Sequence, residues 1–472
     1  MRETPSNQGK VLRSARKLMT LDLGGYRPPV ETIASGSNGI PAVSWAFASL
    51  MSGRNMKLTV CHVLLSFALA GAPTLAGQTS PSAETPMMGT ITDSPFAACV
   101  QNIAGPAQAK GISPEVINHN LTNLSPDPDI LAGPSSQPEF VKPIWDYLDA
   151  TVSDTRIGTG RSKLTEWAQA LDAIETTYGV DRYVVLAIWG IESSYGTVLD
   201  DPTVVKPVIR SLATLACGDP NRAGFWREQL FAALQILERG DINSDRMVGS
   251  WAGAMGHTQF MPTTYLAHAV DFDGDGRRDI WGTVPDALAS TANYLKASGW
   301  RSGESWGYEV ELPHGFDYTL ADDTTERTLS AWAQLGVRPA QGDPFPSRDR
   351  KAVLTLPAGA RGPAFLLLPN FRVILQYNNS TAYALSVGHL VDRLRGGPPL
   401  VRSWPRGDRT LTTSERGELQ MLLERRGFAV GGLDGRIGPK TRAAIRAYQN
   451  SAGLTPDGYA DGALLERLKQ EQ

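Results

Sequence analysis

Apolar residues recur at helical spacing along much of this 472-residue chain. One stripe predicts a helix that ends at Gly179, because glycine readily takes the left-handed backbone just past a helix. Further helices are predicted between Asn221 and Gly240 and over residues 381–394. The members of the first stripe are Leu164, Trp167, Leu171, Ile174 and Tyr178.

The strongest apolar run in this region covers residues 183–191 and ends at Glu192. Asp181 can cap the helix that carries this carboxyl group. Burial disfavours the charged form of a carboxyl group, and an acid that stays protonated near neutral pH can protonate a glycosidic oxygen. The alternative is a glutamate that is only capped or salt-bridged. Glu192 is therefore a candidate general acid that needs support from the rest of the chain.

Two segments show strand-like patterns instead. Residues 308–312 alternate like a half-buried strand, and residues 372–377 read as a more buried one. We therefore predict an α+β fold, mainly helical, for a domain spanning 96–395.

A break in the pattern separates a small C-terminal unit. Gly and Pro residues open a linker over 396–407, and three short helices are predicted within 408–472. Two similar turns, at Asp434-Gly435 and Asp457-Gly458, separate these helices. The pattern indicates a compact three-helix module.

The N-terminal part has a different character. An apolar stretch within 56–76 follows basic residues and contains small residues at which cleavage can occur, which is typical of a secretory signal peptide. It is short for a membrane-anchoring helix, the alternative interpretation. Residues 1–55 are interpreted as an extension that precedes the true start of the protein near Met56, or as a disordered extension. The Ser-, Thr-, Pro- and Gly-rich residues 77–95 are interpreted as a flexible linker.

The amino-acid composition and net charge of the chain limit the classes of protein to which it can belong. The chain is 42% hydrophobic with a net charge of -3, as in ordinary globular proteins, and it has no basic excess that would recruit nucleic acid. Removal of the signal peptide leaves Cys99 and Cys217 in an oxidising compartment, where an even pair favours a disulfide. Two buried free thiols are the alternative.

Three further segments carry polar chemistry: residues 249–265, 271–279 and 376–380. The first is rich in Gly and Ala, which permits close approach of the backbone to a sugar, and Ser250 and Gln259 supply hydrogen-bonding groups. Tight helix packing is the alternative reading of the small residues. Together with residues 190–196 around Glu192, and in this order, the segments resemble the B family of lytic murein transglycosylases.

That resemblance implies a lysozyme-like catalytic domain that cleaves the β-1,4 bond between N-acetylmuramic acid and N-acetylglucosamine without adding water. Glu192 would act first as acid and then as base, leaving a 1,6-anhydromuramyl end, and no cofactor is required for this chemistry. A hydrolytic muramidase and a non-catalytic wall-binding scaffold are the alternatives. The implied substrate-binding residues are Tyr195, Ser250, Gln259, Tyr294, Tyr377 and Asn378.

Five acidic residues suggest a metal site. Four of them fall at positions 1, 3, 5 and 9 of a loop similar to an EF-hand, and the fifth replaces the missing acid at position 12. A solvated acidic turn is the alternative, but the family resemblance favours a structural Ca²⁺. The expected ligands are Asp271, Asp273, Asp275, Asp279 and Asp286.

The C-terminal module resembles a type 1 peptidoglycan-binding domain. Such a module would raise the effective concentration of glycan at the catalytic domain. We therefore expect a periplasmic monomer that binds peptidoglycan glycan strands, keeps no membrane span after signal cleavage, and has wall-synthesis proteins as further partners.

Overall fold

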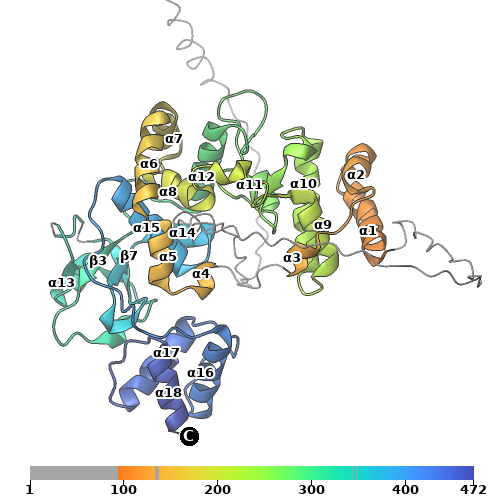
Figure 1. Ribbon diagram of the computed structural model, residues 1–472. Helices are drawn as coiled ribbons and strands as arrows, with labels where there is room; N and C mark the ends of the chain where they lie inside the picture. Colours follow the sequence, from red (N-terminus) through yellow and green to blue (C-terminus); the bar gives the residue numbers. More distant parts are fainter. Residues whose placement is uncertain (1–93, 133–137, 343, 348, 472) are drawn as a thin grey trace, which may run out of the picture. The chain divides into compact units, whose positions relative to one another are not determined.

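The computed structural model describes residues 94–132, 138–342, 344–347 and 349–471 (Figure 1). The predicted extension and signal peptide, and all but the end of the first linker, lie outside the described residues.

Helices dominate the described chain, as predicted. The α-helices are α1 Pro95–Ala109, α2 Pro114–Leu121, α3 Pro128–Ala132, α4 Pro138–Val141, α5 Ile144–Thr151, α6 Asp154–Glu166, α7 Ala168–Tyr178, α8 Arg182–Ser193, α9 Val208–Gly218, α10 Ala223–Glu238, α11 Pro262–His268, α12 Val284–Ala297, α13 Leu329–Gln334, α14 Pro369–Tyr377, α15 Thr381–Leu394, α16 Thr413–Arg425, α17 Pro439–Ser451 and α18 Gly462–Gln470. The strands are β1 Lys206–Pro207, β2 Val248–Gly249, β3 Gly307–Glu311, β4 Arg327–Thr328, β5 Arg338–Pro339, β6 Lys351–Thr355 and β7 Ala364–Leu367.

Helix α8 lies at the centre of the helical region, where it contacts α6, α7, α12 and α15 (Figure 1). From Val184 to Ser193 every residue of α8 is buried. A helix surrounded by other helices can be apolar on all sides, which explains the uninterrupted run in its sequence. Asp181 caps α8 by accepting a hydrogen bond from the backbone amide of Tyr183.

A five-stranded antiparallel sheet lies in the chain between α12 and α14, with the strand order β4-β6-β7-β3-β5. It has a small hydrophobic core of its own that includes Trp332, Leu354 and Leu366. Only β3, predicted over 308–312, was visible in the sequence pattern. Strands of two residues, such as β4 and β5, are too short to show an alternation.

The prediction of a buried strand over 372–377 was wrong, because these residues form the end of helix α14. Pro369 occupies the first turn of this helix, a position that proline favours. Phe371, Ile374 and Tyr377 are buried at a spacing of three, which places them near one face of a helix. A short apolar run fits both the helical period and the pattern of a buried strand, and tertiary packing decides between the two structures.

The stripe from Leu164 to Tyr178 is divided between two helices. Trp167 ends α6 and begins α7, and its backbone lies outside the helical conformation. The predicted end of the stripe is correct, since Gly179 has a left-handed backbone with φ 67°.

The C-terminal module contains the three predicted helices, α16, α17 and α18, around a small core of leucines. Helix α16 begins with a capping box: Thr412 accepts from the amide of Glu415, and the Glu415 carboxylate accepts from the amide of Thr412. Reciprocal capping satisfies two amides that the helix itself leaves without partners.

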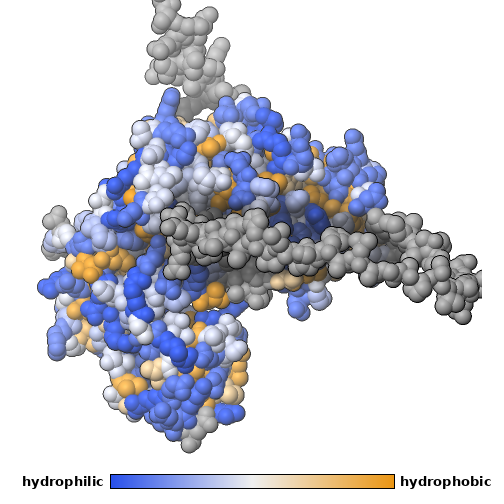
Figure 2. All heavy atoms as spheres, in the orientation of Figure 1, coloured by the Kyte–Doolittle hydropathy of each residue, from blue (hydrophilic) through white to orange (hydrophobic). Residues whose placement is uncertain are grey.

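The surface in view in Figure 2 is largely hydrophilic, with separate hydrophobic patches. Among the described residues, the large hydrophobic side chains that are exposed are Leu131, Phe140, Val141, Leu335, Val401 and Leu433. No helix in the described part of the chain is long and apolar enough to cross a membrane.

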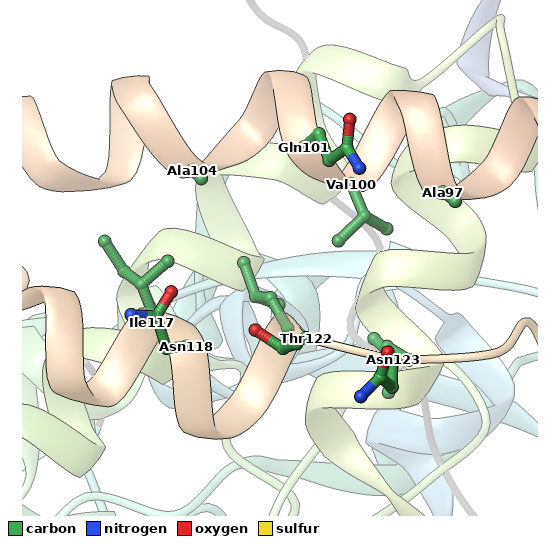
Figure 3. A pocket seen from close by; sticks show the side chains of 10 residues that line it. Ala97, Val100, Gln101, Ala104, Ile117, Asn118, Thr122 and Asn123 are labelled. Atoms are coloured by element: carbon green, nitrogen blue, oxygen red, sulfur yellow. The ribbon is translucent and has the colours of Figure 1, made fainter. Parts of the chain in front are cut away.

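Cys99 of α1 and Cys217 of α9 form a disulfide in the structure. Beside it, a cavity of about 210 Å³ lies between α1 and α2. Val100 and Gln101 line it from α1, Ile117 lines it from α2, and Thr122 lines it just after the end of α2 (Figure 3). Its lining includes none of the predicted site residues.

Candidate active site

Glu192 lies in the last turn of α8 and is 2% exposed. The helix ends directly after it, because Ser194 and Tyr195 both have positive φ angles, 51° and 60°. This sharp end turns the chain away, so that the carboxyl group lies against neighbouring helices instead of the solvent.

Arg156 of α6 holds this helix end. Its guanidinium group donates to the carbonyl oxygen of Gly190 at 2.9 Å and to the hydroxyl of Ser194 at 3.2 Å. Carbonyl groups in the last turn lack partners within the helix, and a buried cation satisfies them. Burial lowers the pKa of Arg156 below its usual value.

Tyr195 belongs to this packing and not to an open groove. Its side chain is 4% exposed, its hydroxyl donates to the carbonyl oxygen of Arg156 at 3.1 Å, and its ring meets Trp189 edge-on. Gly190 is required beneath it, since a Cβ there would come within 2.6 Å of the ring. In this structure Tyr195 supports the end of α8, and its expected role in substrate binding stays a prediction.

Tyr383 of α15 makes the most direct contact with the candidate acid, and the sequence prediction missed it. Its hydroxyl donates to Oε1 of Glu192 at 2.6 Å. Burial, and then the charge of Glu192, hold the pKa of Tyr383 well above its ordinary value, so the hydroxyl keeps its proton. In the sequence Tyr383 reads as one more apolar position of the 381–394 helix, and only the packing of α15 on α8 reveals its partner.

The loop 249–260 is tied to the end of α8. Ser193 donates to the carbonyl oxygen of His257 at 2.6 Å, and Trp189 donates to His257 Nδ1 at 3.1 Å. Burial lowers the pKa of His257 to about 4, so the ring stays neutral and accepts this bond. Gly256 has φ 67°, and a Cβ there would lie 2.5 Å from the carbonyl oxygen of Ile280, which makes glycine necessary at this turn.

Ser250 and Gln259, both predicted site residues, are buried in this loop. Ser250 accepts hydrogen bonds from the amides of Ala252 and Ala254 and so shapes the loop. Gln259 has a positive φ of 57° and donates to the carbonyl oxygen of Gly256 at 2.9 Å. An unusual backbone held in place by its surroundings is common at functional sites.

The predicted residues Tyr294, Tyr377 and Asn378 come together beside this loop. The rings of Tyr294 and Tyr377 meet edge-on, with centroids 5.2 Å apart. The Tyr377 hydroxyl donates to the carbonyl oxygen of Thr258 at 2.5 Å. After burial, the charge of Glu192 is the next cause that raises the pKa of Tyr377, which places this tyrosine near the candidate acid.

Asn378 brings a second buried carboxyl group into the site, one that the sequence prediction did not identify. Its side-chain amide donates to Oε1 of Glu139 in α4 at 3.1 Å. Glu139 is 5% exposed, and burial raises its pKa above 4.5. Ser380, which caps α15, also donates to the backbone carbonyl of Glu139. A lone glutamate in a short segment gives no sequence pattern that would predict this placement.

Several buried polar atoms in this region lack a hydrogen-bond partner among the described residues. They are Oε2 of Glu139, Oγ1 of Thr258, Oε1 of Gln259 and Oδ1 of Asn378. Buried polar atoms are nearly always paired in proteins, because leaving one without a partner costs about 1–3 kcal/mol. Four such atoms contributed by α4, the 249–260 loop and the end of α14 therefore indicate a place where a polar ligand binds.

Three of the five predicted metal ligands gather in the structure. One carboxylate oxygen from each of Asp271, Asp273 and Asp286 lies within 4.8 Å of the others. Burial and the charge of Asp273 are among the causes that raise the pKa of Asp286 to about 6. Hard oxygen donors of this kind suit Ca²⁺, which takes six to eight oxygen ligands.

Asp275 and Asp279 are not among the three carboxylates of this group, and each has local partners in the structure. Their role as ligands stays a prediction. Asp275 pairs with Arg277 at 2.9 Å. Asp279 accepts from the backbone amides of Trp281 and Gly282. The loop spacing of an EF-hand alone could not show that these two carboxylates have local partners.

Comparison with known proteins agrees with this arrangement. Residues 95–392 match the Transglycosylase SLT domain family, and residues 412–468 match the putative peptidoglycan binding domain family. The chain belongs to the transglycosylase SLT domain family, as the resemblance predicted, and its α+β, mainly helical fold class is confirmed.

Individual relatives are similar over different lengths. Membrane-bound lytic murein transglycosylase B of Escherichia coli is 35% identical over 249 residues, which are 52% of this chain and 65% of that protein. SltB3 of Pseudomonas aeruginosa, solved with NAG-anhNAM-pentapeptide, is 49% identical with a TM-score of 0.76, covering 79% of this chain and 99% of SltB3. Slt35 of Escherichia coli, solved with calcium, is 28% identical with a TM-score of 0.52, covering 63% and 92%.

Proposed function

We propose that this protein is a lytic transglycosylase that cleaves the β-1,4 bond between N-acetylmuramic acid and N-acetylglucosamine in peptidoglycan. The observation that carries the proposal is the buried Glu192 held by Tyr383, beside polar atoms that lack partners. Family membership supports it, as does the complex of the similar SltB3 with a peptidoglycan fragment.

Glu192 acts twice in the proposed reaction. It first protonates the glycosidic oxygen, and the bond from that oxygen to the muramyl C1 breaks. The muramyl C6 hydroxyl then attacks C1 and gives its proton to Glu192, so the acid is regenerated and a 1,6-anhydro ring closes. No water is consumed. Because Oε1 accepts the hydrogen of Tyr383, we infer that the transferred proton is carried by Oε2.

The test is mass spectrometry of purified sacculi after digestion. Anhydro ends lack one water relative to reducing ends, so they identify the lytic reaction, while reducing ends would instead identify a hydrolytic muramidase. Sacculi that bind the protein without being cleaved would identify a wall-binding scaffold.

Replacing the acid gives the matching mutational test. Glu192→Gln keeps an oxygen that can accept from Tyr383, but it cannot donate and recover the proton. We expect turnover to fall by about 10²- to 10⁴-fold, the usual contribution of a general acid, with an unchanged melting temperature. Activity that persists in this variant would contradict the proposal.

We also propose a structural Ca²⁺ on Asp271, Asp273 and Asp286. The three clustered carboxylates and the calcium in the similar Slt35 structure support it. The ion supplies charge compensation to the loop between α11 and α12 and takes no part in the reaction.

The remaining predictions stay proposals of the same kind. We propose that residues 412–468 hold the enzyme on the wall, in keeping with the family they match. Periplasmic location through a signal peptide, a monomeric state and wall-synthesis partners rest on the sequence interpretation alone.

A further inference from the structure

The C-terminal module contains the same turn twice. In the first, Gln420 donates to Oδ1 of Asp434 and accepts from the amide of Gly435 at 2.8 Å. In the second, Gln449 donates to Oδ1 of Asp457 and accepts from the amide of Gly458 at 2.8 Å.

The equivalence extends to the residues that follow. The amide of Arg436 donates to Asp434 Oδ1 at 2.9 Å, and the amide of Tyr459 donates to Asp457 Oδ1 at 3.0 Å. In both aspartates Oδ1 thus accepts the bonds from within the module. Any difference between the two turns concerns Oδ2.

The second turn is occupied by another part of this chain. Oδ2 of Asp457 accepts the backbone amide of Ala360, which follows β6, at 2.9 Å. Arg446, in the helix that precedes this turn, donates to the backbone carbonyl of Ala321 at 3.0 Å. The group that the second turn binds is therefore the N–H of a secondary amide. Its acceptor is Oδ2 of Asp457, the outer carboxylate oxygen.

The first turn offers the same acceptor at the surface. Asp434 is exposed, and its bonds from other described residues go to Oδ1. Leu433 beside it is 59% exposed, the highest value among the large hydrophobic residues described. Arg436 and Lys440 are also exposed and add positive charge. An apolar side chain, a carboxylate acceptor and cations together suit a ligand with methyl groups, amide N–H groups and carboxylates.

We propose that the Asp434-Gly435 turn is the peptidoglycan-binding site of the module, and that the Asp457-Gly458 turn attaches the module to the sheet region. The carboxylate Oδ2 of Asp434 accepts an amide N–H of the wall, as Asp457 accepts that of Ala360. Peptidoglycan carries such amides in its acetamido groups and in its stem peptides. The inference rests on the proposed function in taking peptidoglycan as the ligand.

The position of the first turn favours the same polymer. Arg416 donates to the carbonyl oxygen of Gly435 at 2.8 Å and contacts the carbonyl oxygen of Phe140 in α4. The neighbouring Glu139 belongs to the candidate active site. A strand bound at the turn would therefore lie near α4, the helix that contributes Glu139 to the candidate active site.

The experiment compares two isosteric variants in the full chain carrying Glu192→Gln, so that the wall is not digested. Asp434→Asn keeps Oδ1 for Gln420 and Arg436 but replaces the outer acceptor with an NH₂ donor. Asp457→Asn makes the same change in the occupied turn. Sedimentation with purified sacculi should show affinity lowered about 10-fold by Asp434→Asn, and by less than about 2-fold by Asp457→Asn.

A second set of sacculi, stripped of stem peptides by an amidase, distinguishes the two sources of the amide. A 10-fold effect that persists on the bare glycan assigns the amide to the acetamido group, and an effect that disappears assigns it to the stem peptide. Equal affinity of Asp434→Asn and its parent for intact sacculi overturns the inference and leaves the proposed function standing. A parent that does not bind sacculi would overturn both.

Discussion

A hydrogen bond from Tyr383 helps to position Glu192, the candidate acid of this protein. Glu192 is buried where burial favours its neutral form, and Tyr383 donates to one of its oxygens, which favours the charged form. A group that must both donate and recover a proton benefits from such opposing influences. The tyrosine is a positioning residue that acts through the glutamate.

We expect Tyr383→Phe to lower kcat by about 10- to 100-fold with little change in KM, because a hydrogen bond to a charged group contributes about 1.5–3 kcal/mol. Initial rates on a soluble glycan measure both constants. Tyr448→Phe is the matched control, since Tyr448 donates to Glu471 at 2.7 Å within the module. A fall in kcat for the control, or none for Tyr383→Phe, would contradict the assignment.

At the scale of elements, helix α15 carries a second polar group with a raised pKa besides Tyr383. It carries Tyr383 near its beginning and the half-buried Asp392 near its end, where Trp306 donates to the carboxyl group at 3.0 Å. Burial raises the pKa of Asp392 from 3.8 to about 7. The helix that positions the candidate acid therefore contains a group whose charge is unfavourable at neutral pH.

The pH dependence of stability follows from this shift. The folded state holds a proton on Asp392 between pH 3.8 and about 7, where the unfolded state has released it, so stability declines as pH rises through this range. We expect Asp392→Asn, which keeps an acceptor for Trp306, to raise the free energy of unfolding by about 1–3 kcal/mol at pH 8. Near pH 4 the gain should disappear. Chemical denaturation at both pH values measures it, and an equal gain at both would contradict the assignment.

The loop between α11 and α12 should respond to calcium. We expect Ca²⁺ at about 100 times its Kd to stabilise the fold by about 2.7 kcal/mol, seen as a higher melting temperature. Mg²⁺ should do less, because it demands stricter geometry. Asp286→Asn should abolish the effect, whereas Asp275→Asn should preserve it, since Asp275 lies outside the cluster. Equal losses in both variants would favour a ligand set that includes Asp275.

At the scale of the whole molecule, long-range links join parts of the chain that are distant in sequence. The disulfide joins α1 to α9 across 118 residues, and the turn at Asp457 joins the module to Ala360, between β6 and β7. The disulfide also restricts the unfolded chain, whereas the hydrogen bond acts only in the folded state.

We expect Cys99→Ser with Cys217→Ser to lower the free energy of unfolding by about 2–5 kcal/mol, the range for removal of a native disulfide. Denaturation curves with and without a reducing agent measure the effect. The reductant should destabilise the parent and leave the double variant unchanged. A parent that is insensitive to complete reduction would argue for two free thiols.

The sequence by itself determined the features that depend on neighbouring residues. Local spacing predicts the helical stripes, the cap at Asp181, the helix end at Gly179 and the three helices of the module. The ordered motifs around Glu192 were sufficient to identify the family. Local rules fail where one pattern fits two structures, as at 372–377, which became helix α14.

Only the tertiary structure decided which side chains meet. Tyr383 and Glu192 are 191 positions apart, and Asn378 and Glu139 are 239 apart. It also shows that Tyr195 packs at the end of α8 and that Asp275 and Asp279 have local partners. The physical reason is that the orientation of a side chain depends on the packing of several helices at once, and no short stretch of sequence contains that information.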